Sequence, residues 1–389
     1  MNDVLLIGVD GGATEAKAHA AACNDLQRPT SFRLRPEAAA RVYPRLPGFT
    51  PVAVAEQLAQ RNSGDIRLSE QEVTQGRMWI EAAAQAVVEI AQQCGAKRAL
   101  VGMGMPGLKT PDGRGINTIN NGPRMPRYLE MLERMIAAAG VELASPVAAL
   151  GSDADYCGLG EEYAADGLFR DVQDAYYLGG GTGIADAMKL RGRLVPFDAA
   201  KPWIQKSWQM PSALGPTFEK LVSASSLNRV WGDLNGAGGG RAAPYPEVAA
   251  VQGDPLAMAW LDTAALVLAE LIFERLWTIK NGRADAPHRG EAYAKLNPEH
   301  EYRGVLLERV IIGQRVGLIY ADAQYRAVVA DKLDAYLASC IAAGGDAEMA
   351  RTYLNSATSA LKSGFVRASR LRAAPALGAA VAAVRAPTA

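Results

Sequence analysis

The sequence is poor in the residues that build metal centres and disulfide frameworks. It has 4 cysteines and 3 histidines among 389 residues. The cysteines, Cys23, Cys94, Cys157 and Cys340, are widely scattered, and no two of them form a CxxC pair. This spacing predicts neither a disulfide framework nor a zinc site, and it is typical of a reducing compartment.

The sequence also lacks an excess of charge of one sign. Lysine and arginine number 41, as do aspartate and glutamate, so the formal net charge is zero. Binding to nucleic acid or to an acidic surface needs clustered basic residues. The composition therefore favours neither kind of partner, and we expect no nucleic-acid partner.

Long apolar runs are missing as well. The first run stops at Asp10 and has no basic segment before it, which argues against a signal peptide. The most apolar helical stretch, 261–277, contains Asp262, Glu270 and Glu274. A membrane span needs about 20 predominantly apolar residues, so we expect a buried helix here, no membrane partner and a cytoplasmic protein.

The length exceeds the usual size of one hydrophobic core, which predicts two domains. Apolar strand-like runs at 4–9 and 99–103 alternate with helical patterns at 69–94 and 126–139. Ser69 and Glu72 form a capping box for the first of these helices. Later segments, 214–223, 255–279 and 327–343, are mainly helical in pattern. The alternation predicts an α/β fold with a partly parallel sheet.

A glycine-rich motif, GVDGGATEAK at 8–17, follows the first apolar run. It has neither the spacing of a Rossmann fingerprint nor that of a P-loop, and an acid lies inside the turn. The motif offers the Asp10 carboxylate for hydrated Mg²⁺ and Gly11 and Gly12 for close backbone approach. Thr14 and Lys17 offer a hydroxyl and an ammonium for phosphate oxygens. The alternative is an ordinary glycine-rich hairpin, with Lys17 solvated.

A second motif, GGGTG at 179–183, also follows an apolar strand-like run. Successive glycines can direct backbone N–H groups inward to bind an anion, although a tight β-turn is an alternative. The segments 5–20 and 175–190 share an order of strand, glycine turn with threonine, and small residues. This internal similarity favours two related halves, each with one phosphate turn.

Together these motifs resemble the sugar-kinase branch of the actin, sugar-kinase and heat-shock-chaperone ATPase superfamily. The pattern is similar to that of the ROK (repressor, open reading frame, kinase) family and of the N-acetylglucosamine kinase and benzoyl-CoA-reductase-activator-like group. The resemblance covers nearly the whole chain, in family order. It includes the two phosphate motifs (10–17 and 180–183), GMGMPGLKTPDGRGINTINN (102–121), SDADYCGLGE (152–161), VIIGQRVG (310–317) and APALGAAVAA (374–383).

The resemblance implies two ribonuclease-H-like lobes with a nucleotide and sugar cleft between them. The N-terminal lobe would comprise 1–150 and the C-terminal helix 374–389, and the C-terminal lobe 151–373. ATP and Mg²⁺ are the implied cofactors, a small-molecule sugar is the implied partner, and we expect a homodimer. By composition 14–23 favours a helix, but the resemblance makes it a strand, and we expect the strand because tertiary context overrides propensity.

Asp153 is the residue that the resemblance marks as the catalytic base. It lies where an apolar run meets a helix start, and a carboxylate there can accept a hydroxyl proton. The alternative is that Asp153 caps the helix. Asp155 is the nearby competitor, expected to be a cap or a sugar contact.

The resemblance also implies binding residues. Substrate contacts would come from Gly107, Asn120, Asn121, Ser152 and Asp153, with a simple turn at 120–123 as the alternative for the asparagines. Nucleotide contacts would come from Asp10, Gly11, Gly12, Thr14, Lys17, Gly180, Gly181, Thr182, Gly183, Gly313 and Gln314. Gln314 stands where the family usually has a second glycine.

The sequence departs from the ROK pattern at 193–215, where a Glu-x-Gly-His segment and a His and Cys cluster for zinc are usual. The segment contains neither histidine nor cysteine, so we expect no zinc. Lys201, Trp203, Gln205 and Lys206 would form a different sugar-contacting wall, or an exposed loop with a packed tryptophan. Because the first strand opens the chain, we do not expect a DNA-binding repressor, and no cysteine pair suits an iron–sulfur cluster.

These observations predict an ATP-dependent sugar kinase acting on a hexose or hexose derivative. Two alternatives stay open. One is a non-catalytic sensor of sugar or ATP with the same fold, and the other is an ATPase whose acceptor is not a sugar.

Overall fold

The computed structural model describes residues 4–25, 30–238 and 242–386. The chain divides into two compact units, Met1–Gly167 with Ala373–Ala389, and Leu168–Arg372. We call these unit 1 and unit 2. Unit 1 extends past the predicted boundary at residue 150. The C-terminal helix expected over 374–389 is observed as α14, Ala374–Arg385, in unit 1, and residues 387–389 lie outside the described part.

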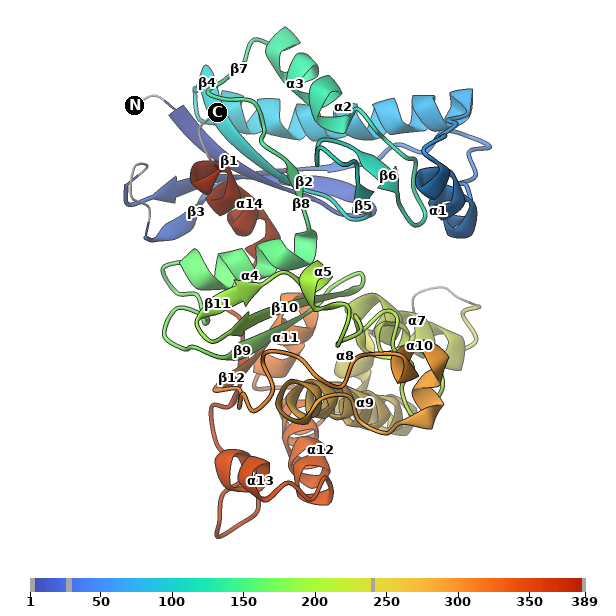
Figure 1. Cartoon of the computed structure of the whole chain (residues 1–389), viewed down its shortest axis with the longest axis vertical. Coiled ribbons are helices and arrows are strands. Elements are labelled where there is room, and N and C mark those ends of the chain that lie inside the picture. The colour runs from blue at the N-terminus through green and yellow to red at the C-terminus, as the bar shows by residue number, and fades with distance from the viewer. Residues whose placement is uncertain (1–3, 26–29, 239–241, 387–389) are drawn as a thin grey trace. The chain divides into compact units, whose positions relative to one another are not determined.

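Unit 1 is built on one mixed sheet with the order β3-β2-β1-β4-β7, and β8 also pairs with β4 (Figure 1). Its strands are β1 Val4–Gly11, β2 Glu15–Cys23, β3 Phe32–Val42, β4 Arg98–Gly104, β7 Glu142–Leu143 and β8 Leu150–Gly151. The first three are antiparallel, whereas β4 is parallel to β1 and both β7 and β8 are parallel to β4.

The strand expected at 14–23 against its helical composition is confirmed as β2. Ala16, Ala18 and Ala20 are fully buried on one face of this strand. Pairing with strands on both sides supplies the backbone hydrogen bonds that a helix would otherwise provide. Tertiary pairing thus decides the structure here.

Helices and a small hairpin complete unit 1. They are α1 Val54–Ser63, α2 Glu70–Gln93, α3 Tyr128–Ala138, α4 Asp153–Tyr163, and the hairpin strands β5 Leu108–Lys109 and β6 Ile116–Thr118. The Ser69 hydroxyl accepts a hydrogen bond from the Glu72 N–H at 3.1 Å, so α2 begins at the predicted cap. Ile80, Val87 and Ile90 of α2 belong to the core that contains the apolar side chains of β1.

Helix α14 lies directly against the backbone of two strands. A Cβ atom added to Gly8 would lie 1.8 Å from the Ala376 carbonyl oxygen, and one added to Gly102 would lie 1.8 Å from that of Ala379. No side chain fits at either position without moving the helix. Figure 1 shows α14, in red, beside the blue strand β1, which precedes it by more than 350 residues.

Unit 2 repeats the strand arrangement of unit 1. Its sheet has the order β11-β10-β9-β12-β13, in which the first three are antiparallel and β12 and β13 follow in parallel. The strands are β9 Ala175–Gly180, β10 Ile184–Leu190, β11 Arg193–Val195, β12 Arg309–Gly313 and β13 Val366–Ala368. The common topology accounts for the internal similarity of the sequence, and the predicted α/β class is confirmed.

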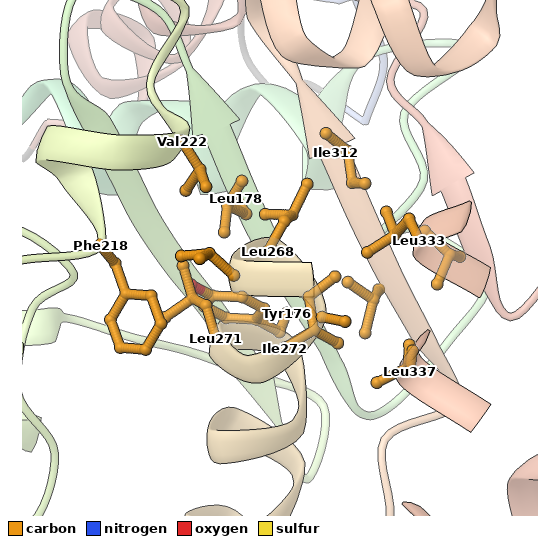
Figure 2. Packing of buried hydrophobic residues seen from close by; sticks show 14 of the residues in the cluster. Tyr176, Leu178, Phe218, Val222, Leu268, Leu271, Ile272, Ile312, Leu333 and Leu337 are labelled. Atoms are coloured by element: carbon orange, nitrogen blue, oxygen red, sulfur yellow. The ribbon is translucent and has the colours of Figure 1, made fainter. Parts of the chain in front are cut away.

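The helices of unit 2 surround a large apolar core. They are α5 Phe197–Ala200, α6 Glu219–Val222, α7 Ala224–Leu234, α8 Pro246–Val251, α9 Pro255–Asn281, η1 Pro287–Arg289, α10 Gly290–Ala294, α11 Gln314–Ala321, α12 Ala330–Ala343 and α13 Ala347–Tyr353. Figure 2 shows Leu268, Leu271 and Ile272 of α9 around Tyr176 and Leu178 of β9. By length and composition α9 is a candidate membrane span, but its apolar side chains fill this core, as expected for a buried helix.

One helix predicted from the sequence is absent over most of its length. Instead of a helix over 214–223, only α6 forms, from Glu219 to Val222. Gly215 has φ of 97° and is followed by Pro216, and this pair interrupts the helix on its N-terminal side.

Candidate functional site

Three parallel strands of unit 1 end side by side. Asp10 on β1 is in register with Gly104 on β4, and Gly104 is in register with Gly151 on β8. Because the carboxyl ends of parallel strands meet at one edge of a sheet, these residues form a row there. Helix α4 begins two residues after Gly151, at Asp153. The topology therefore brings two predicted site carboxylates, Asp10 and Asp153, to the same edge.

The electrostatics of Asp10 reflect this arrangement. The pKa of Asp10 is raised from 3.8 to about 6, mainly by burial and next by the Asp153 carboxylate, whereas Lys17 lowers it and Glu15 adds a small increase. The Asp153 charge thus makes the ionised form of Asp10 less favourable. A cation bound at this edge would relieve both the desolvation and the repulsion.

The donors present suit hydrated Mg²⁺ better than a closed protein cage. Within 4–25, 30–238 and 242–386, no group of three or more His, Cys, Asp or Glu side chains is placed to hold a metal ion. Mg²⁺ keeps much of its water and is commonly held by one or two carboxylates together with substrate phosphates. A partly buried carboxylate at a strand end, as Asp10 is, fits that mode of binding.

The first glycine turn connects β1 to β2. The Gly12 N–H donates to the Glu15 carbonyl at 3.0 Å, and the Thr14 carbonyl accepts from the Tyr43 N–H at 2.9 Å. Both bonds hold the turn through its backbone. The Thr14 side chain is left exposed, where a hydroxyl can contact a ligand.

Gly11 and Lys17 lie beside this turn in different settings. A Cβ atom on Gly11 would lie 2.0 Å from the Met105 sulfur, so the end of β1 and the segment after β4 approach each other closely here. The Lys17 ammonium forms an ion pair with Glu15 at 2.9 Å, and its side chain is 47% exposed. Lys17 is thus both near Asp10 and partly solvated.

The N-terminus of α4 shows which residue caps the helix. Ser152 is the N-cap, and its hydroxyl accepts from the Asp155 N–H at 3.5 Å. Asp153 is the first helical residue instead, at the end of the helix where a negative charge is favourable. Capping, the alternative role for Asp153, is therefore carried by Ser152.

The Gly-x-Pro-Gly loop after β4 is tightly folded. Gly107 has φ of 94°, and a Cβ atom there would lie 2.4 Å from the Thr118 carbonyl oxygen. The Lys109 ammonium donates to the Gly107 carbonyl at 2.9 Å and to the Met105 carbonyl. Only glycine suits position 107, because it combines a left-handed backbone with close approach of another strand.

Asn120 and Asn121 lie in an exposed turn, and Asn121 has φ of 58°. The turn is fixed by Gln57 on α1. Its side-chain oxygen accepts from the Ile119 N–H at 2.8 Å, and its amide nitrogen donates to the Ile119 carbonyl at 3.0 Å. The asparagines are therefore presented by a held loop, and a sugar contact remains a prediction.

Sequence reasoning missed two polar side chains close to this turn. Asn117 and Thr118 are 7% and 5% exposed, and neither the Asn117 Oδ1 nor the Thr118 Oγ1 has a hydrogen-bond partner within the described structure. Buried polar atoms usually have a partner, so each of these suggests a water or a ligand group. The only signal in the sequence was a polar pair inside the apolar strand GINTI.

The second glycine turn, 181–183, connects β9 to β10 in unit 2. The Gly181 N–H donates to the Gly183 carbonyl at 2.9 Å, and the Ile184 N–H donates to the Glu219 carboxylate at 2.9 Å. Thr182 is exposed. Glu219 was also missed, because only the fold brings α6 against this turn.

Gly180 and Gly313 are the strand ends beside the second turn. A Cβ atom on Gly180 would lie 2.3 Å from the Val316 side chain. Gly313 ends β12 in register with Gly179 on β9, and Gln314 follows it as the first residue of α11. The structure thus gathers the predicted nucleotide residues of unit 2 at one sheet edge, as it does those of unit 1.

The segment 197–213 has a packed tryptophan. Trp203 is 6% exposed and stacks on His300 with a centroid distance of 4.1 Å and an interplanar angle of 13°. The ammonium groups of Lys201 and Lys206 lie 2.6 and 3.9 Å from the Asp198 carboxylate. Gln205 is 9% exposed, and its side-chain oxygen lacks a hydrogen-bond partner among the described residues. Trp203 therefore packs in the core, whereas the Gln205 side-chain oxygen can accept a hydrogen bond from a ligand.

Comparisons with known proteins place this fold. No family model and no curated protein sequence matches the chain. Among solved structures, a ROK hexokinase from Thermus thermophilus is 18% identical, with 97% of each chain covered and a TM-score of 0.52. A ROK family glucokinase from Streptomyces griseus, in complex with glucose and AMPPNP, is 15% identical, with 97% and 98% covered and a TM-score of 0.55.

The chain thus has the fold seen in the ROK-family sugar kinase structures, and the resemblance predicted from the motifs is confirmed at this level. A ROK family transcriptional regulator, a homologue of the E. coli MLC protein, is also similar, at 13% identity and a TM-score of 0.53. The match covers 98% of this chain and 78% of that one. The fold alone therefore does not separate kinases from regulators.

The raised pKa of Asp10 makes a prediction for stability. Because the folded protein keeps this proton up to about pH 6 and the unfolded chain only to about pH 3.8, stability falls as pH rises between these values. Asp10→Asn should therefore raise the free energy of unfolding of the metal-free protein by about 1–3 kcal/mol at pH 7.5. At pH 4 the gain should be small. Urea unfolding at both pH values measures the difference.

Glu15→Gln is the control for this experiment, because Glu15 also contributes charge near Asp10 but lies in a half-exposed ion pair. It should change stability little at either pH. An equal effect of Asp10→Asn at pH 4 and pH 7.5 would contradict the assignment of the raised pKa.

Proposed function

We propose that the protein is a cytoplasmic, homodimeric, ATP-dependent sugar kinase. It transfers the γ-phosphoryl group of MgATP to a hydroxyl of a hexose or hexose derivative. The observation that carries the proposal is the pair of carboxylates at one sheet edge, Asp10 at the end of β1 and Asp153 at the start of α4. Phosphoryl transfer needs charge neutralisation for the donor and a base for the acceptor, and these two residues supply one each.

Asp153 would accept the proton of the attacking hydroxyl. Its position at the first turn of a capped helix limits its motion, so it can orient the hydroxyl toward the phosphorus atom. Ser152, Asn120, Asn121 and the Gly107 backbone would hold the other sugar hydroxyls. An amide both donates and accepts, as recognition of a hydroxyl requires.

Asp10 would hold Mg²⁺ through water. The metal, when bound, supplies positive charge against the β- and γ-phosphate oxygens. Gly11, Gly12, Thr14 and Lys17 would contact those oxygens from the first turn. In unit 2, Gly180, Gly181, Thr182 and Gly183 would offer backbone N–H groups to phosphate, and Gly313 and Gln314 would border the adenosine.

A non-catalytic sensor is the second candidate, favoured by the likeness to a ROK transcriptional regulator. A sensor does not need a base at the start of α4, and the presence of Asp153 favours catalysis over sensing. An ATPase with a non-sugar acceptor is the third candidate, and it would release ADP without any sugar.

A screen of ADP release with MgATP tests the proposal. Hexoses, amino sugars, N-acetyl sugars and polyols are supplied one at a time, and a reaction without acceptor measures background hydrolysis. We expect at least one sugar to raise the rate well above background. ATP binding without turnover on any acceptor would support the sensor, and sugar-independent ADP release would support the ATPase.

A further inference from the structure

Gln314 occupies a backbone conformation that favours glycine. It follows Gly313 at the end of β12, begins α11, and has φ of 57°. Side chains with a Cβ atom are disfavoured in this left-handed region, and residues held there often mark functional sites. The position therefore tolerates glutamine at a cost in backbone strain.

The side chain of Gln314 lies across the second glycine turn. A Cβ atom on Gly181 would lie 2.1 Å from the Gln314 Oε1. One on Gly179 would lie 2.8 Å from the Tyr177 ring and 3.1 Å from the Gln314 Nε2. The carboxamide thus fills the space next to Gly181 and shares the space next to Gly179 with the Tyr177 ring. Gln314 is only partly buried.

This contact changes what the turn can offer to a ligand. Glycines at a phosphate turn leave the backbone bare, so that N–H groups can approach an anion. Here the bare surface of Gly179 and Gly181 is already contacted by a neutral carboxamide from the same unit. A ligand that approaches this surface must first displace that side chain.

We propose that the Gln314 side chain restricts access of a nucleoside triphosphate to the second glycine turn. The inference rests on the proposed function, because it takes the donor to bind at this turn. The carboxamide must turn away from Gly179 and Gly181 when the nucleotide binds. Free energy spent on this displacement lowers the affinity for the donor.

Three substitutions separate the side chain from the backbone. Gln314→Gly removes the carboxamide and suits the positive φ. Gln314→Asn also tolerates this φ but is one methylene shorter, so it cannot reach Gly181 in the same way. Gln314→Met keeps the length without the amide and is the matched control.

The measurement is the dissociation constant of Mg-AMPPNP for the full chain by isothermal titration calorimetry. Gln314→Gly and Gln314→Asn should each bind about tenfold more tightly than the parent, and Gln314→Met should stay within about twofold, since tenfold is a modest free-energy change for one displaced side chain. The KM for ATP should fall in parallel, while the KM for the sugar should not change.

Weaker binding by the Gly and Asn variants would overturn the inference, because the Gln314 side chain would then favour donor binding instead of restricting it. Unchanged binding in all three variants would overturn it as well. Tighter binding without turnover on any sugar would support the inference while contradicting the kinase assignment. Absence of nucleotide binding by the parent and all variants would contradict both.

Discussion

Asp153→Asn should reduce sugar-dependent turnover by about 10³-fold, within the 10²–10⁴ range usual for loss of a positioned acid or base. The amide keeps the size of the side chain but cannot accept a proton from the hydroxyl. Because Ser152 caps α4, the helix should keep its structure in the variant. Nucleotide affinity should therefore stay within about twofold of the parent, as expected for a group that acts on the acceptor.

Steady-state kinetics and calorimetry of the same protein preparations measure these two effects. Asp155→Asn is the comparison, because Asp155 lies one residue beyond Ala154 in the same helical turn and competes for the role of base. Its kcat should fall less than about tenfold, as for a residue that does not take the proton. Loss of turnover in Asp155→Asn with a normal Asp153→Asn variant would reassign the base.

Loss of the Asp153 charge should also act on Asp10. The Asp153 carboxylate is one cause of the raised pKa of Asp10, so Asp153→Asn should lower that pKa toward its usual value. The shift provides a readout that is independent of turnover. A sensor of the same fold would show the shift in pKa without any change in phosphoryl transfer.

The fold was largely predictable because its signals are local and repeated. Strand, glycine turn and strand occur in both halves, and each half forms the same sheet. Ser69 and Glu72 marked the start of α2 because a capping box needs only three residues of spacing. The prediction of a helix at 214–223 was wrong because it followed the apolar pattern and gave too little weight to the Gly-Pro pair inside the segment.

The site was predictable only where a single segment carries it. Asp10 lies at the end of β1 and the GGGTG motif begins at the end of β9, so the sequence marks both directly as candidates. Gln57 binds Ile119 from 62 residues away, and Glu219 binds Ile184 from 35 residues away. No local sequence pattern predicts such contacts. The orientation of Gln314 across Gly181 likewise depends on two strands that meet only in the folded sheet.

Arg275→Met should destabilise unit 2 by about 3–5 kcal/mol, the usual cost of leaving a buried carboxylate without its cation. Arg275 is fully buried on α9, and its guanidinium lies 3.2 Å from Asp186 and 2.8 Å from Glu274. It also donates to the Ser207 hydroxyl at 3.1 Å. The loss should therefore loosen the segment 197–213 as well as the core, and urea unfolding followed by tryptophan fluorescence measures both.

Arg229→Met is the matched control for Arg275→Met, because the Arg229–Asp233 pair on α7 is 3.3 Å long and nearly half exposed. It should change stability by about 0.5 kcal/mol or less, as exposed ion pairs do. The double variant Asp186→Leu with Arg275→Met should be less destabilised than the sum of its single variants, because it removes both members of the Asp186–Arg275 pair, while Glu274 loses its cation in the double variant and in Arg275→Met alike. Additive losses would mean that Asp186 and Arg275 stabilise the fold independently and that their ion pair carries no coupling.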